Sequence, residues 1–209
     1  MIRVKICGIA DVASALVASE AGADAIGLIF APSRRQVTPQ RAREITAALP
    51  PFVSKVGVFV DEDHHRIEDL ASACGLQAVQ LHGAESPEFC EGFGVPVIKA
   101  IRVKDASSVE RLADYQVSAF LLDTYDASAL GGTGKAFDWS LAAHAAQTHR
   151  VLLSGGLTPE NVMSALTRVH PYGVDVSSGV ETDGTKDHGK IRAFIRRVRE
   201  WEFAVSPHG

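Results

Sequence analysis

Short apolar runs alternate with helical patterns along the whole chain. Several runs, such as VGVFV at 56–60 and AFLLD at 119–123, are continuous rather than alternating, which is typical of parallel strands buried on both faces. The pattern therefore predicts repeated βα units. The eight expected strands cover residues 2–7, 24–30, 53–60, 78–81, 96–102, 118–123, 151–154 and 172–177.

Helix start signals fill the intervals between these runs. Asp11 precedes a segment with an apolar face, and Gly22 follows that segment. Three further intervals place a hydroxyl side chain before a proline, at Thr38-Pro39, Ser86-Pro87 and Thr158-Pro159. Other candidate N-caps are Asp61, Asp105 and Asp138. A last helix is expected over about 187–201, followed by a frayed tail at 202–209.

Eight βα units predict an α/β protein with a single (β/α)8 TIM barrel spanning residues 1–209. An open, doubly wound sheet uses the same alternation and is the structural alternative. Closure is favoured because an open sheet leaves two edges to protect. We therefore expect one catalytic domain with tight loops.

Composition narrows the function classes. Hydrophobic residues make up 46% of the 209 residues, charged residues 22%, and the net charge is −4, which is ordinary for a globular enzyme and unlike a nucleic-acid-binding protein. No apolar stretch has membrane-spanning length, and the N-terminus does not resemble a signal peptide. The three cysteines are widely spaced and the histidines lack metal-binding spacing. We expect a cytoplasmic protein without disulfides or metal.

Two strand ends carry candidate catalytic groups. The first run, IRVKIC, ends in Cys7, and the sixth ends in Asp123. Active sites of TIM barrels lie at the C-terminal ends of the strands. The alternatives are that Cys7 is a small buried apolar residue and that Asp123 caps a turn. Lys5 shares a strand face with Cys7, but the sequence leaves open whether it lies near the thiol.

Two glycine-rich turns follow the seventh and eighth strands, where barrels often bind phosphate. Small residues allow backbone N–H groups to approach an anion, and helix N-termini favour negative charge. The alternative is that these are ordinary tight βα turns. The candidate phosphate-binding residues are Gly155, Gly156, Ser178 and Gly179.

The long connection at 124–137 contains GGTGK. This segment lacks the GxxxxGK[ST] spacing of a nucleotide-binding loop, so a lid over the site is the favoured interpretation and a plain surface loop the alternative. The expected lid residues are Gly131, Gly132, Gly134 and Lys135.

Taken in order, these motifs resemble the phosphoribosylanthranilate isomerase family of tryptophan biosynthesis over almost the whole chain. The resemblance rests on KICGI at 5–9, GADAIGLIFAPSRRQVT at 22–38, VGVFV at 56–60, VQLHG at 79–83, LLDT at 121–124, GGTGKAFDW at 131–139, LSGGL at 153–157 and DVSSGVE at 175–181. It implies a barrel without cofactor or metal. The implied reaction is the Amadori rearrangement of N-(5-phosphoribosyl)anthranilate to 1-(2-carboxyphenylamino)-1-deoxyribulose 5-phosphate.

The resemblance also implies residue roles. Cys7 matches the general base, Asp123 the general acid, and Arg35 the arginine that binds the anthranilate carboxylate, with the adjacent Arg34 as an alternative. As a base, Cys7 must be largely thiolate, and as an acid Asp123 needs a raised pKa from burial or substrate binding.

Three further side chains are possible substrate contacts. Gln80 and His82 end the fourth strand, and Asp175 ends the eighth, where it either faces substrate hydroxyls or bonds turn amides. The partner is a small phosphorylated molecule, and the sequence is compatible with a monomer or a homodimer. Alternative functions are a non-catalytic sugar-phosphate-binding barrel or another phosphosugar isomerase or epimerase.

Overall fold

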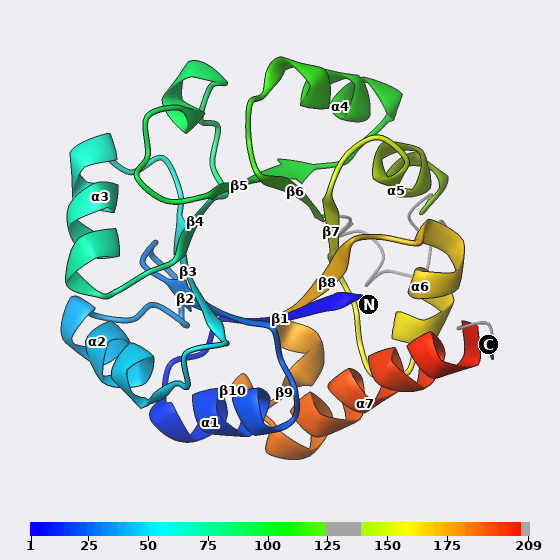
Figure 1. Cartoon of the computed structure of the whole chain (residues 1–209), viewed down its shortest axis with the longest axis horizontal. Coiled ribbons are helices and arrows are strands. Elements are labelled where there is room, and N and C mark those ends of the chain that lie inside the picture. Colours follow the sequence, from blue (N-terminus) through cyan, green and yellow to red (C-terminus); the bar gives the residue numbers. More distant parts are fainter. Residues whose placement is uncertain (124–138, 206–209) are drawn as a thin grey trace.

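Eight parallel strands form a closed ring with helices around it (Figure 1). The computed structural model describes residues 1–123 and 139–205. Each strand pairs with the next, and the eighth closes on the first with Lys5 beside Asp175. The barrel is confirmed and the open sheet is wrong. The strands are β1 Arg3–Cys7, β2 Ala25–Ile29, β3 Ser54–Phe59, β4 Ala78–Leu81, β5 Val97–Arg102, β6 Ala119–Asp123, β7 Val151–Ser154 and β8 Gly173–Val176.

Helices cover the outside of the barrel, and several begin at the predicted caps. Asp11 Oδ1 accepts a hydrogen bond from Ser14 N at 2.7 Å. Thr38 and Asp105 cap their helices in the same way. The described helices are α1 Val12–Glu20, α2 Pro39–Ala48, α3 His64–Ala73, α4 Ala106–Glu110, α5 Trp139–Ala146, α6 Val162–Val169 and α7 His188–Val205.

The connection between β4 and β5 departs from the predicted helix. It holds only a 3-10 turn, η1 Glu88–Cys90, although Ser86 Oγ does accept from Phe89 N as a cap would. Gly92, with φ +81°, turns the chain away two residues later. One turn is therefore all that this segment forms.

Two helix starts also differ from the prediction. α3 begins after Asp63 rather than Asp61, because Asp61 adopts a left-handed φ of +48° and accepts from Ala84 N instead. α6 begins after Asn161, three residues beyond Thr158. Asp138 lies outside the described residues.

The expected frayed tail is wrong for residues 202–205, which continue α7. The helix is held past the predicted end because Trp201 is buried and its Nε1 donates to Thr167 Oγ1 at 2.8 Å. Residues 206–209 lie outside the described chain.

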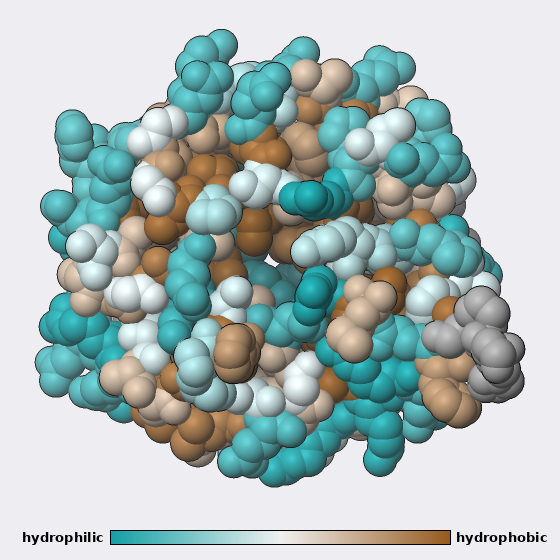
Figure 2. Space-filling view, viewed as in Figure 1, coloured by the Kyte–Doolittle hydropathy of each residue, from teal (hydrophilic) through white to brown (hydrophobic). Residues whose placement is uncertain are grey.

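The core has two parts. Side chains on the outer face of the sheet, such as Val4, Ile6 and Ile26, pack against the helices in one large apolar cluster. The inner face is narrower and holds a small cluster of Ile98, Ala100, Leu121 and Leu152. Buried polar side chains complete the interior, among them Lys5, Gln80, Lys99 and Asp175. Figure 2 shows a hollow at the middle of the molecule that hydrophobic and hydrophilic residues both border.

No helix in residues 1–123 or 139–205 is both long and apolar enough to cross a bilayer. Cys7, Cys74 and Cys90 are free thiols. Within the same residues, no three side chains of the His, Cys, Asp and Glu types are grouped to hold a metal ion.

Candidate active site

Cys7 and Asp123 line one cavity at the C-terminal ends of the strands. The cavity has a volume of about 260 Å³ and opens between the ends of β1, β4, β6, β7 and β8. The same cavity is lined by the expected contacts Gln80, His82 and Asp175 and by the turn residues Gly155, Gly156, Ser178 and Gly179. Closure of the barrel therefore brings residues from distant parts of the chain to one pocket, which is lined by every predicted site residue that the structure describes except Arg35.

Cys7 is the last residue of β1, where its side chain faces the barrel interior. It is only 6% exposed, yet its thiol borders the cavity instead of joining the outer apolar cluster. Burial raises the pKa of the Cys7 thiol above its usual range, while the Lys5 ammonium lowers it and the Asp175 carboxylate raises it. A group at this position is placed to react, but its thiolate form depends on nearby cations.

Asp123 ends β6 and lies near His82, which follows β4. The distance from His82 Nε2 to Asp123 Oδ2 is 3.5 Å. On the other side of the imidazole ring, Gln80 Nε2 lies 2.9 Å from His82 Nδ1. Because the Gln80 amide nitrogen can only donate, His82 Nδ1 accepts and a neutral ring carries its proton on Nε2, toward Asp123. Gln80 and His82 therefore form a short chain that ends at the Asp123 carboxylate.

Asp175 is buried in the wall of the cavity, with both oxygens engaged. Oδ1 accepts from Lys5 Nζ at 2.7 Å and Oδ2 from Ser154 Oγ at 3.1 Å. No turn amide is bonded by Asp175 in these contacts, and its place in the cavity lining keeps contact with substrate hydroxyls as a prediction. The residue supplies negative charge beside Lys5 and Cys7.

The two glycine-rich turns close one side of the cavity. Gly155 and Gly156 have φ of +88° and +64°, so the first turn uses the left-handed conformations that glycine adopts without strain. At Gly179 a Cβ atom would lie 1.8 Å from Leu157 O, so the second turn can pack on the first only with glycine there. The result is a concave backbone surface of the kind that binds anions.

Arg35 does not line this cavity. Its Nε and Nη2 donate to the two carboxylate oxygens of Glu181 at 2.6 and 2.8 Å. Lys186 Nζ also donates to Glu181, at 2.6 Å, and Arg34 Nη2 does so at 3.1 Å. The Arg35 side chain passes over the end of β1, since a Cβ on Gly8 would lie 2.6 Å from its Cδ. Arg35 therefore stands at the rim of the site, held by Glu181.

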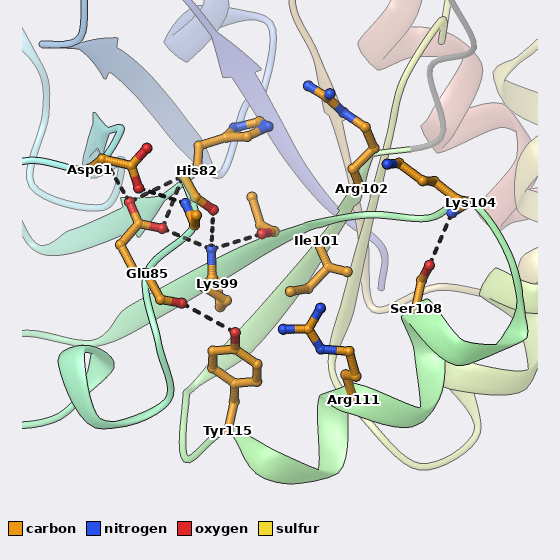
Figure 3. A pocket seen from close by; sticks show the side chains of 13 residues that line it. Asp61, His82, Glu85, Lys99, Ile101, Arg102, Lys104, Ser108, Arg111 and Tyr115 are labelled. Atoms are coloured by element: carbon orange, nitrogen blue, oxygen red, sulfur yellow. Dashed lines mark hydrogen bonds and ion pairs between the residues drawn. The ribbon is translucent and has the colours of Figure 1, made fainter.

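A larger cavity of about 530 Å³ adjoins the first and shares His82 with it (Figure 3). Its wall contains the buried pair Lys99 and Glu85, with Nζ and Oε2 2.8 Å apart. Lys99 Nζ also donates to backbone carbonyls, including Gly83 O at 2.9 Å. Neither Cys7 nor Asp123 lines this larger cavity, so the predicted chemistry belongs to the smaller one.

The family model described as N-(5'-phosphoribosyl)anthranilate (PRA) isomerase matches residues 4–197. The chain belongs to this isomerase family. It is therefore an enzyme of the family that its motifs resemble, and the resemblance is confirmed.

Individual relatives agree with the family assignment. The N-(5'-phosphoribosyl)anthranilate isomerase of Pelobacter propionicus is 54% identical over 202 residues, which cover 96% of this chain and 97% of the relative. The crystal structure of phosphoribosyl anthranilate isomerase from Thermotoga maritima is 48% identical, with a TM-score of 0.89, and the match covers 96% of this chain and all of that one. A solved isomerase in complex with reduced 1-(o-carboxyphenylamino)-1-deoxyribulose 5-phosphate is 46% identical, with a TM-score of 0.86.

Sequence reasoning missed two residues that hold Arg35 at the rim of the cavity or share its partner, Glu181 and Lys186. Glu181 ends the DVSSGVE motif, but nothing in its neighbourhood indicates a partner 146 residues earlier in the chain. The Glu181 carboxylate contacts three basic side chains, Arg34, Arg35 and Lys186, only because the fold brings them together. The expected lid residues Gly131, Gly132, Gly134 and Lys135 lie outside the described residues.

The Glu181 cluster predicts an acid-dependent contribution to stability. Burial alone would raise the pKa of Glu181, but hydrogen bonds from Arg35 and Lys186 outweigh it and lower the pKa to about 2 from an ordinary 4.5. The stabilisation is therefore complete above pH 4.5 and is lost as the pH falls toward about 2. We expect Glu181→Gln to lower the melting temperature at neutral pH, and the difference from wild type to shrink over this acidic range.

Thermal unfolding of both proteins across this pH range measures the effect. Glu44→Gln is the matched control, because Glu44 pairs with Arg41 on the exposed surface and such pairs contribute little. If the melting temperature of Glu181→Gln stays below that of wild type by the same amount down to about pH 2, the pKa of the carboxylate is not lowered by folding or the loss of stability is steric.

Proposed function

We propose that this chain converts N-(5-phosphoribosyl)anthranilate into 1-(2-carboxyphenylamino)-1-deoxyribulose 5-phosphate in tryptophan biosynthesis, with Cys7 as general base and Asp123 as general acid. The observation that carries the proposal is that Cys7 and Asp123 line one cavity, which the two glycine-rich turns also line. A phosphorylated sugar bound at the turns would present its carbon chain to both groups. The whole chain then serves as one catalytic domain.

The reaction needs one acid and one base. Proton transfer from Asp123 to the furanose ring oxygen lets the C1–O bond break and leaves an iminium at C1. The Cys7 thiolate then removes the proton from C2, and the electron pair of that C–H bond forms the C1–C2 double bond of an enolamine. Tautomerisation of the enolamine gives the ketone. Atoms and electrons balance without an added oxidant or reductant.

His82 and Gln80 support the acid in this proposal. The Nε2–H of His82 is directed at Asp123, so it steadies the carboxylate before substrate binds and after the proton has left. To act as the acid, Asp123 must carry a proton in the reactive complex. Asp175 acts in the cavity wall through Lys5 rather than as a direct acid or base.

The phosphate group is assigned to the turns after β7 and β8. Gly155, Gly156, Ser178 and Gly179 line the cavity on the side of these turns, and their small side chains leave backbone N–H groups accessible. Fixing the phosphate there provides binding energy remote from the reacting carbons, which positions C2 near Cys7.

We expect Arg35→Met to raise KM about 10- to 100-fold with a much smaller effect on kcat, because a charge-assisted contact to the anthranilate carboxylate is present in both ground and transition states. Steady-state kinetics measure this. Arg34→Met is the matched variant, since Arg34 also reaches Glu181 but is more exposed. A KM increase in Arg34→Met alone would assign the carboxylate contact to Arg34.

The activity itself is tested by following the fluorescence of N-(5-phosphoribosyl)anthranilate generated in situ. Rapid loss of the anthranilate fluorescence on adding the purified chain supports the proposal. Sugar-phosphate binding without turnover would favour the non-catalytic barrel. Turnover only of other phosphosugars, with metal tightly bound, would favour an epimerase.

The proposal also covers the cellular location and the oligomeric state of the protein. The three free thiols fit a reducing cytoplasm. The sequence is compatible with a monomer or a homodimer, and a related structure is of monomers generated from the dimeric isomerase of Thermotoga maritima. Light scattering of the purified chain decides between the two.

A further inference from the structure

Lys5 is a buried cation inside the barrel that the proposed reaction has not yet used. It lies two residues before Cys7 on β1, on the same interior face, and its side chain is 2% exposed. Its Nζ atom is 2.7 Å from Asp175 Oδ1 on the neighbouring strand β8. A buried lysine is costly, so an ammonium at this position is retained only where its surroundings favour the charge.

The Lys5 ammonium reaches Cys7 as well as Asp175. The positive charge of Lys5 and the negative charge of a Cys7 thiolate attract each other. Burial alone would lower the pKa of Lys5, but Asp175 and Cys7 together keep it raised, so Lys5 stays protonated at neutral pH. A charged hydrogen-bond donor beside a thiol favours the thiolate.

Gly27 leaves the space in which the two groups meet. It is the residue of β2 directly beside Cys7 in the sheet register. A Cβ atom on Gly27 would lie 2.8 Å from Cys7 Sγ and 3.1 Å from Lys5 Nζ. Any larger residue would therefore displace the thiol, the ammonium or both.

Other charges near Cys7 act in both directions. Burial raises the pKa of Cys7 most, Lys5 opposes it most, Asp175 raises it, and Lys186 lowers it. The charged and titratable groups that face Cys7 or share its cavity are Lys5 on β1, Arg35 after β2, His82 after β4, Asp123 on β6, Asp175 on β8 and Lys186 on β10 (Thr185–Lys186). Lys5 is thus the principal cation offsetting burial.

We propose that Lys5 is the positioning residue of the base: held by Asp175 and given room by Gly27, its ammonium stabilises the Cys7 thiolate. This rests on Cys7 being the base. The pairing also explains why Asp175 is engaged on both oxygens, since a fixed carboxylate holds the ammonium in place without itself approaching the sulfur. The structural alternative is that Lys5 serves only to neutralise Asp175 inside the barrel.

The test is the pH dependence of Cys7 alkylation by iodoacetamide, read at the Cys7 peptide by mass spectrometry. In Lys5→Met we expect the midpoint of reactivity to rise by about one pH unit or more, so that alkylation below the midpoint slows about tenfold. Lys99→Met is the matched control, because Lys99 is the other buried barrel lysine and forms its ion pair with Glu85 (Figure 3). The two residues line the larger cavity, which Cys7 does not line. The Cys7 midpoint of Lys99→Met should equal that of wild type.

Two further variants separate thiolate stabilisation from simple neutralisation of Asp175. In Lys5→Met/Asp175→Asn no unpaired carboxylate remains, yet the midpoint should still lie above that of wild type because the cation is absent. A midpoint restored to the wild-type value would overturn the proposal. Gly27→Ala keeps both charges, and if Lys5→Met does not fold, a raised midpoint in Gly27→Ala supports the proposal and an unchanged one refutes it.

Alkylation reports the thiolate whether or not the enzyme turns over. If Cys7→Ala retains full isomerase activity while the Lys5→Met midpoint is raised, the role of Cys7 as base fails but the Lys5–Cys7 contact stands. If Cys7→Ala is inactive and the Lys5→Met midpoint is unchanged, the base stands and the role of Lys5 fails. If Cys7 is the base and Lys5 stabilises its thiolate, the pH profile of kcat in Lys5→Met should shift to higher pH, as the alkylation midpoint does.

Discussion

Cys7→Ala is expected to lower kcat about 10³-fold or more, since general acid–base catalysis contributes on the order of 10²- to 10⁴-fold and no other thiol lines the cavity among the described residues. The fold should survive, because the side chain is small and borders the cavity rather than the outer apolar cluster. KM should change little, as the thiol removes a proton but does not anchor the phosphate or the carboxylate.

Steady-state kinetics and circular dichroism of the same preparation measure this effect. Cys90→Ala is the matched control: Cys90 is equally buried but lies in η1, within the outer cluster, and its pKa is raised to about 11, so it has no tendency to form a thiolate. Near-wild-type turnover in Cys7→Ala would remove Cys7 from the mechanism.

Asp123→Asn should also lower kcat about 10³-fold while leaving substrate binding close to that of wild type. The amide has nearly the same shape as the carboxylic acid but cannot deliver a proton to the ring oxygen. Its carbonyl oxygen can still accept from His82 Nε2, whose distance to the present carboxylate is 3.5 Å. The loss is therefore expected in the chemical step and not in the positioning of the fourth strand.

The same fluorescence assay, run under single-turnover conditions, separates chemistry from product release. Asp105→Asn is a suitable control, because Asp105 only caps α4 on the outside of the barrel and asparagine is also a good N-cap. If Asp123→Asn opens the ring at the wild-type rate, another group must supply the proton, and His82 would be the next candidate in the cavity.

Local sequence predicted the barrel well because each strand carries its own signal. Continuous runs such as VGVFV at 56–60 suit a strand covered on both faces, and caps such as Asp11 stop the intervening helices from starting elsewhere. Where the local signal was weak, prediction failed: Ser86 and Pro87 start a turn between β4 and β5 that Gly92 does not allow to become a helix.

The principal site residues could also be located from sequence, for a geometric reason. In a closed parallel barrel all strand C-termini meet at one rim, so residues that end apolar runs, such as Cys7 and Asp123, come together whatever their separation in the chain. The turns after β7 and β8 follow the same rule, and all of them line one cavity.

The ion-pair partners of the charged residues around the site could not be located from sequence. Whether Lys5 meets Asp175, 170 residues away, depends on which residues of β1 and β8 lie side by side when the ring closes. Arg35 finds Glu181 because two loops from distant units pack over the same rim. Strand register and loop packing are properties of the assembled chain. Periodicity along the sequence therefore identifies the strands and their ends, but the charges that surround Cys7 depend on contacts that only closure of the barrel creates.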